Sequence, residues 1–138
     1  MRKINYIVVH CSATREGCTL TSEVLEAEHR RRGFRTTGYH YYIRRDGTVL
    51  GTRSLELPGA HCRGHNKYSI GICYEGGLDA RGNPKDTRTP EQRSALHLLV
   101  YQLLQQFRNA RVCGHRDLSP DLDGAVGVGE AVSVLRGK

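Results

Sequence analysis

The sequence predicts an α/β fold in which a central mixed β-sheet is flanked by helices. Short apolar runs alternate with amphipathic segments along the chain, a pattern typical of layered α/β domains. The chain has 138 residues, of which 38% are hydrophobic. This is enough to bury one core and too little for two ordinary domains, so we expect a single domain over residues 1–138.

The N-terminal part of the chain predicts one strand and one helix. Residues 4–10 are rich in β-branched positions and predict a buried strand. Residues 22–32 predict a helix, with Thr21 or Ser22 as the N-cap and Gly33 as the residue that ends it. The helix has a basic end, which complements its dipole and is expected in solvent.

The middle of the chain predicts a hairpin and a further strand. Residues 39–44 and 48–52 read as two strands joined through Asp46-Gly47, a dipeptide that favours the positive φ of a tight turn. Residues 69–74 predict another strand, and residues 75–88 a polar loop that contains glycines.

The C-terminal part predicts a long helix and a last strand. A capping box with proline at the first helical position marks the helix start at residues 89–92. Apolar residues then repeat at helical spacing, at Leu96, Leu99, Leu103 and Phe107. Residues 110–113 predict the strand that follows.

Charge and composition restrict the class of partner. Lys and Arg number 21 against 14 acidic residues, a net charge of +7, which favours a polyanionic partner such as a cell-wall polymer or a nucleic acid. The basic residues are spread over the whole chain, and they do not alternate with aromatic residues on which bases could stack. This pattern does not favour nucleic acid as the partner. No apolar run approaches the ~20 residues of a membrane span, so we expect no membrane partner.

Cysteines and the N-terminus indicate the compartment. The chain has five cysteines, an odd number without a C-x-x-C pair, which predicts reduced thiols rather than a disulfide framework or a zinc knuckle. Nothing at the N-terminus resembles a signal peptide. We therefore expect the protein to be cytoplasmic when it is synthesised.

Two histidines close apolar, strand-like runs, and small polar or charged residues follow both. They are His10 and His115, which lie 105 positions apart in the sequence. Imidazoles mounted at the ends of neighbouring strands can converge on one cation, as in a catalytic metal site. The alternative for each histidine is a hydrogen-bonded residue of the core or of a turn.

An ordered set of short sequence motifs, or words, runs through the chain from about residue 4 to about residue 123. The words are His-Cys-Ser-Ala-Thr at 10–14, Gly-Tyr-His-Tyr at 38–41, Arg-Asp-Gly-Thr at 45–48, Gly-Ala-His at 59–61, Gly-His-Asn at 64–66, Ser-Ile-Gly-Ile at 69–72 and Gly-His-Arg-Asp at 114–117. Together they resemble the zinc-dependent N-acetylmuramoyl-L-alanine amidases of phage-lysozyme type, relatives of the peptidoglycan recognition proteins.

The resemblance implies an activity and a set of site residues. It implies hydrolysis of the amide between N-acetylmuramic acid and L-alanine by a zinc-activated water, with peptidoglycan as the partner of a monomer that lyses cell walls. His10 and His115 are implied as two of three zinc ligands, and Tyr39 as the catalytic tyrosine that stabilises the oxyanion or orients the water. His61 and Asn66 are implied to face the substrate.

The chain departs from the family in its tail, residues 124–138. The family continues to a Lys-x-Cys-Pro word whose cysteine is the third zinc ligand, whereas this tail contains no Cys, His or Trp. If the reading frame shifts by one nucleotide, the codons of residues 124–135 can spell E-P-W-E-W-V-K-Q-C-P-C-F. We therefore hypothesise that the tail is the family's terminus read out of frame. Without the third ligand, with Asp121 or Asp123 as possible substitutes, the alternative function is a non-catalytic module that binds muropeptide.

Overall fold

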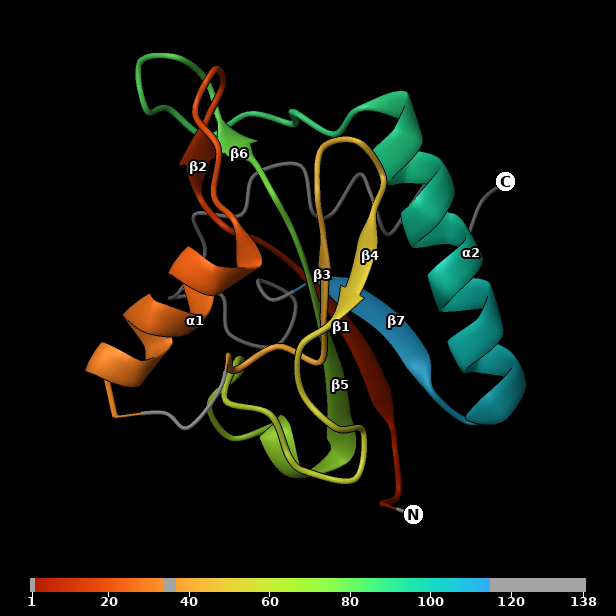
Figure 1. Cartoon of the computed structure of the whole chain (residues 1–138). Helices are drawn as coiled ribbons and strands as arrows, with labels where there is room; N and C mark the ends of the chain where they lie inside the picture. Colours follow the sequence, from red (N-terminus) through yellow and green to blue (C-terminus); the bar gives the residue numbers. More distant parts are fainter. Residues whose placement is uncertain (1, 34–36, 115–138) are drawn as a thin grey trace.

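The computed structural model describes residues 2–33 and 37–114, so His115 and the tail lie outside the described residues. Within them, a five-stranded sheet lies between two helices (Figure 1). The elements of this layer structure are β1 (Tyr6–Cys11), α1 (Ser22–Arg31), β3 (Tyr41–Ile43), β4 (Val49–Gly51), β5 (Ser69–Tyr74), α2 (Pro90–Gln106) and β7 (Arg111–Gly114). The predicted α/β class is confirmed.

The sheet is mixed, with strand order β4-β3-β5-β1-β7 in the described part of the chain. Strand β1 is parallel to both β5 and β7, and β3 is parallel to β5. Among these five strands only β4 runs antiparallel, because it returns from β3 through the predicted hairpin. In that turn Gly47 has a φ of 89°, and the Thr48 amide donates to Asp46 Oδ1 at 2.9 Å.

The two helices cover opposite faces of the sheet (Figure 1). Successive side chains of a strand point to opposite faces, so each strand contributes to both. The face under α2 is mainly aliphatic. Besides the buried Tyr74, it includes Ile7, Val9, Ile70, Ile72 and Val112 together with Leu96, Leu99, Val100 and Leu103 of the helix. The face under α1 has a smaller cluster, in which Leu25 packs with Tyr42 and Cys73.

Helix α1 has the N-cap and the terminating glycine that its sequence predicts, but one residue of its basic end is buried. Thr21 Oγ1 accepts a hydrogen bond from the Val24 amide at 3.2 Å, and Gly33 lies just beyond the helix with a φ of 95°. Val24 is 48% exposed, whereas His29 is only 6% exposed. The expectation that the whole basic end lies in solvent is therefore wrong for His29.

Helix α2 has the predicted capping box. The Gln92 amide donates to Thr89 Oγ1 at 3.0 Å, and the Thr89 amide donates to Gln92 Oε1 at 3.0 Å. The buried Gln92 side chain also donates to the carbonyls of Ile43 and Glu75 at 3.3 and 2.9 Å. The cap therefore fixes the start of α2 against the ends of β3 and β5.

The segment predicted as a loop after residue 74 contains a short strand. Strand β6 (Gly77–Leu78) pairs in parallel with β2 (Thr14–Arg15), forming a small second sheet. Two-residue strands have too few positions to show a period in the sequence, and both residues before Leu78 are glycines. All five cysteines lie in the described residues as free thiols, as expected. None of the helices described here is long and apolar enough to cross a membrane.

Candidate active site

A cluster of aromatic side chains surrounds His10 on the face of the sheet under α1. His10 is the fifth residue of β1, is 3% exposed and pairs in register with Cys73 of β5. Its ring centroid lies 5.2 Å from that of Tyr39 and 4.9 Å from that of His61. The structure therefore brings together three of the five residues that the sequence predicts for the site.

Hydrogen bonds link His10 to His61 and His61 to Ser69. His10 Nε2 lies 2.9 Å from His61 Nδ1, and His61 Nε2 lies 3.2 Å from Ser69 Oγ. The three residues come from the end of β1, the loop before β5 and the first position of β5. Sequence reasoning missed this role of Ser69, because the Ser-Ile-Gly-Ile word at 69–72 predicts a strand but not a side-chain contact with a histidine of the loop before it.

The side chain of Asn66 supports the loop that carries His61. Asn66 opens a short 3-10 helix, η1 (Asn66–Tyr68), and its Oδ1 accepts hydrogen bonds from the amides of His61 and Cys62, both at 2.9 Å. This oxygen therefore fixes the backbone beneath His61. The substrate-facing roles of Asn66 and His61 stay predictions.

Tyr39 packs between two histidines on the α1 side. Its ring centroid lies 5.2 Å from that of His10 and 5.5 Å from that of His29. Burial, together with the nearby thiols of Cys73 and Cys11, raises the pKa of the Tyr39 hydroxyl well above its usual value. At neutral pH Tyr39 is therefore a hydrogen-bond donor and not a base.

His29 holds the backbone that carries Tyr39. The Gly38 amide donates to His29 Nδ1 at 2.7 Å, and burial, with Arg32 nearby, lowers the pKa of His29. Gly38 is also pressed against the segment of His61, since a Cβ at Gly38 would lie 2.2 Å from the Ala60 carbonyl oxygen. Glycine at 38 thus allows the Tyr39 and His61 segments to meet. The run of arginines after His29 conceals this role in the sequence.

His40 is a structural histidine beside the cluster. The Gly71 amide donates to His40 Nδ1 at 3.0 Å, and His40 Nε2 lies 2.8 Å from the Leu57 carbonyl oxygen. Burial lowers the pKa of His40 to about 4, so its ring is neutral at physiological pH. With Nδ1 accepting, the single ring proton resides on Nε2 and is donated to Leu57.

His115, the second predicted metal ligand, lies outside the described residues. The pairing of β1 with β7 extends to Val9 and Gly114, and each of these residues directly precedes one of the two histidines in sequence. Among the residues that the structure describes, no group of three His, Cys, Asp or Glu side chains could hold a metal ion. Of the predicted ligands, only His10 can therefore be tested for its fit to a metal.

The surroundings of His10 fit a metal ligand. A metal-ligating histidine usually donates its other ring N–H to a fixed partner, which sets its tautomer and orientation. His61 Nδ1 lies 2.9 Å from His10 Nε2 and would be such a partner in the tautomer that carries the His10 proton on Nε2. Coordination would then fall to His10 Nδ1.

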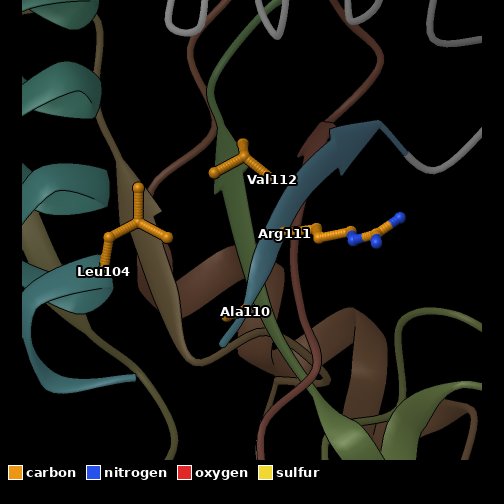
Figure 2. A pocket seen from close by; sticks show the side chains of 4 residues that line it. All are labelled: Leu104, Ala110, Arg111 and Val112. Atoms are coloured by element: carbon orange, nitrogen blue, oxygen red, sulfur yellow. The ribbon is translucent and has the colours of Figure 1, made fainter. Parts of the chain in front are cut away.

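A pocket on the other side of the sheet is separate from this cluster. It lies between the C-terminal half of α2 and β7 and is lined by Leu104, Ala110, Arg111 and Val112 (Figure 2). Val112 pairs in register with Ile7 on the aliphatic face, whereas His10 points to the opposite face. The pocket is therefore no part of the His10 site.

Comparison with known proteins gives consistent matches over most of the chain. The profile of the N-acetylmuramoyl-L-alanine amidase family matches residues 1–125. The endolysin of Enterobacteria phage K11 is 38% identical over 135 residues, covering 94% of this chain and 89% of its own length. A peptidoglycan-recognition protein of Drosophila melanogaster is 29% identical over 120 residues, covering 83% of this chain and 65% of its own length.

A solved structure supports the same assignment. The amidase LysC from Clostridium intestinale URNW superposes with a TM-score of 0.81 at 27% identity, covering 96% of this chain and 85% of that one. The similarity therefore extends from sequence to three-dimensional arrangement.

Proposed function

Because this chain belongs to the N-acetylmuramoyl-L-alanine amidase family, we propose that the cluster around His10 is its active site and that its substrate is peptidoglycan. The bond cleaved is the amide between the lactyl group of N-acetylmuramic acid and L-alanine. One observation carries the proposal. The buried imidazole of His10, near the end of β1, is hydrogen-bonded to the imidazole of His61 and packs against the protonated Tyr39.

The proposed cofactor is zinc, with His10 and His115 as two of its ligands. Bound zinc would polarise the scissile carbonyl and lower the pKa of a bound water towards 7. His10 would contribute Nδ1, since its Nε2 is engaged with His61. Tyr39 would donate a hydrogen bond from its hydroxyl to the charge that develops on the carbonyl oxygen, because its raised pKa keeps the hydroxyl protonated at neutral pH.

The third ligand decides how active this particular chain is. The family profile matches as far as residue 125, and residues 124–138 contain no Cys or His. We propose that a change of reading frame near Asp123 replaced the family's terminal cysteine. The gene would then still contain the out-of-frame word, and sequencing the source DNA tests this directly.

A second candidate function is binding of muropeptide without cleavage. It is favoured by the lack of a third ligand in the tail and by the likeness to a peptidoglycan-recognition protein. Loss of one ligand lowers zinc affinity and removes the fixed geometry of the open coordination position. The described cluster could still hold a peptide through Tyr39 and the loop of His61.

The experiment compares the present chain with a chain whose frame is restored from residue 124. Zinc per molecule is measured by atomic emission, hydrolysis by loss of turbidity of purified cell walls, and binding by sedimentation with the walls. We expect the restored chain to bind one zinc and to cleave at least about 10²-fold faster. Equal cleavage by both chains would mean that another ligand, such as Asp121 or Asp123, completes the site. Wall binding without cleavage by both would favour the binding module.

We further propose that the protein is a monomer, made in the cytoplasm, that reaches the cell wall on release. The phage relatives, which are endolysins, support this order of events. Light scattering during size-exclusion chromatography would measure the mass in solution, for which the chain's 15.5 kDa is the expected value.

A further inference from the structure

The proposed function uses the bond between His10 and His61 but assigns no role to His61 itself or to Ser69, which continues the chain of hydrogen bonds. The two links of this chain measure 3.2 and 2.9 Å, and all three residues lie on different segments. His61 thus occupies the middle of a line that starts at a fully buried serine and ends at the proposed metal ligand.

Two glycines, Gly59 and Gly71, leave the space that the ring of His61 occupies. A Cβ at Gly59 would lie 2.4 Å from His61 Cδ2, and a Cβ at Gly71 would lie 2.5 Å from the same atom. Both positions therefore require glycine for the ring to lie where it does. Asn66 Oδ1 fixes the backbone amide of His61 at 2.9 Å. The ring has little freedom to turn away from His10.

The direction of the hydrogen bonds decides what His10 can do. Of two facing imidazole nitrogens, one must carry the proton. If His10 Nε2 donates, His61 Nδ1 accepts, the proton of neutral His61 resides on Nε2, and Ser69 Oγ accepts it. His10 Nδ1 then carries a lone pair for a cation. If His61 donates instead, the proton of neutral His10 resides on Nδ1 and blocks coordination.

We propose that His61, supported by Ser69, is a positioning residue that fixes His10 as the Nε2–H tautomer with Nδ1 turned to the cation. This inference rests on the proposed function, because it takes His10 as the zinc ligand. It adds a role for His61 that acts through His10 and not through the substrate. Loss of such a supporting partner typically weakens metal binding about 10–100-fold.

The first test needs neither metal nor substrate. Long-range proton–nitrogen NMR spectra of the full chain at about pH 8, where an ordinary imidazole is neutral, report which ring nitrogen of His10 carries the proton. We expect Nε2–H in the unaltered chain. His61→Asn keeps an acceptor near the position of Nδ1 and should preserve this tautomer, whereas His61→Leu should give a mixture. A proton on His10 Nδ1 in the unaltered chain, or an unchanged tautomer in His61→Leu, would overturn the proposal.

The second test is zinc affinity, measured by competition with a chromogenic chelator. His61→Leu should bind zinc about 10–100-fold more weakly than the unaltered chain, and His61→Asn should recover part of the loss. His65→Leu is the matched control, because His65 lies in the same loop and contacts Tyr6 instead of His10. Equal affinity in His61→Leu would overturn the positioning role. If the unaltered chain binds no zinc, the proposed cofactor fails for this chain, and the tautomer still decides the role of His61.

Discussion

The two faces of the sheet are built from the same strands, but they carry different chemistry. Under α2, aliphatic side chains of β1, β5 and β7 pack on four apolar residues of the helix. Under α1, the same strands present His10 and Cys73, and Tyr39 and His61 pack on them from loops. Adjacent residues such as Val9 and His10 thus belong to different environments.

The residues that stabilise the fold and the residues of the candidate active site thus lie on opposite faces of one sheet. The α2 face gains free energy from burying apolar surface, at about 25 cal/mol per Å². On the α1 face the buried rings of His10 and His29 have hydrogen-bond partners, in His61 and in the Gly38 amide. We infer that substitutions on the α2 face change unfolding and that those on the α1 face change catalysis.

The strongest challenge to this comparison is His10→Ala in the frame-restored chain. We expect the rate of peptidoglycan hydrolysis to fall more than about 10³-fold, because a zinc ligand and the charge stabilisation that depends on it are both lost. Turbidity assays measure the rate, and circular dichroism checks the fold. The matched control is His97→Ala, since His97 is an exposed residue of α2. Retained activity in His10→Ala would remove the site from this face.

Tyr39→Phe sharpens the comparison by removing one hydroxyl while the ring stays packed on His10 and His29. We expect a fall of about 10²–10³-fold in kcat, the usual cost of losing one oxyanion donor, with little change in KM. Tyr41→Phe is the control, because Tyr41 packs on the aliphatic cluster of the α2 face. If the two variants have the same kcat, Tyr39 is an ordinary packing residue.

Ile72→Val tests the other face at the position next to Cys73. Ile72 is fully buried in the aliphatic cluster, so losing one methylene should lower the free energy of unfolding by about 0.5–1.5 kcal/mol. Urea denaturation followed by circular dichroism measures this loss. Activity per folded molecule should be unchanged. A loss of activity larger than the loss of stability would show that the two faces are coupled.

The elements of the fold could be predicted from the sequence because their signals are local. The capping box at Thr89 and the turn at Asp46-Gly47 each act over a few residues, and the structure has both. The second sheet could not be predicted, since β2 and β6 each have two residues and begin far apart in the sequence, at Thr14 and Gly77.

Only those residues of the candidate site that lie in family-like sequence motifs could be predicted. His10, Tyr39 and His61 stand in such words, and the structure places their rings together. The supporting residues Ser69 and His29 could not be found, because their contacts depend on how loops fold over the sheet. Such contacts leave no periodic signal in the sequence.

The two faces meet at Glu75, directly after β5, and this residue gives the smallest predicted effect. Its buried carboxylate accepts hydrogen bonds from Arg44 Nε at 2.8 Å and from the amides of Leu20 and Arg45 at 2.8 and 3.0 Å. Its backbone carbonyl accepts from Gln92 of α2. Glu75 therefore ties the segment before α1 and the start of α2 to the same point of the sheet.

Glu75 should make the free energy of unfolding depend on pH in the acid range. Burial by itself raises the pKa of its carboxyl, but the bonds from Arg44, Leu20 and Arg45 outweigh it, and the net pKa lies below the ordinary 4.5. The folded state thus binds this proton less readily than the unfolded state does. The contribution to stability is complete above the unfolded pKa and is lost as the pH falls through the folded pKa. Because burial opposes the bonds, we expect a modest effect.

Glu75→Gln isolates this contribution, since other acidic groups titrate in both chains. Urea denaturation at a series of pH values from neutral to acid should show a smaller loss of stability on acidification in Glu75→Gln than in the unaltered chain. At neutral pH the variant should be the less stable of the two, because the ion pair with Arg44 is broken. Parallel curves at all pH values would mean that the bonds of Glu75 are equally strong with a protonated carboxyl, and the two faces would then meet without an electrostatic tie.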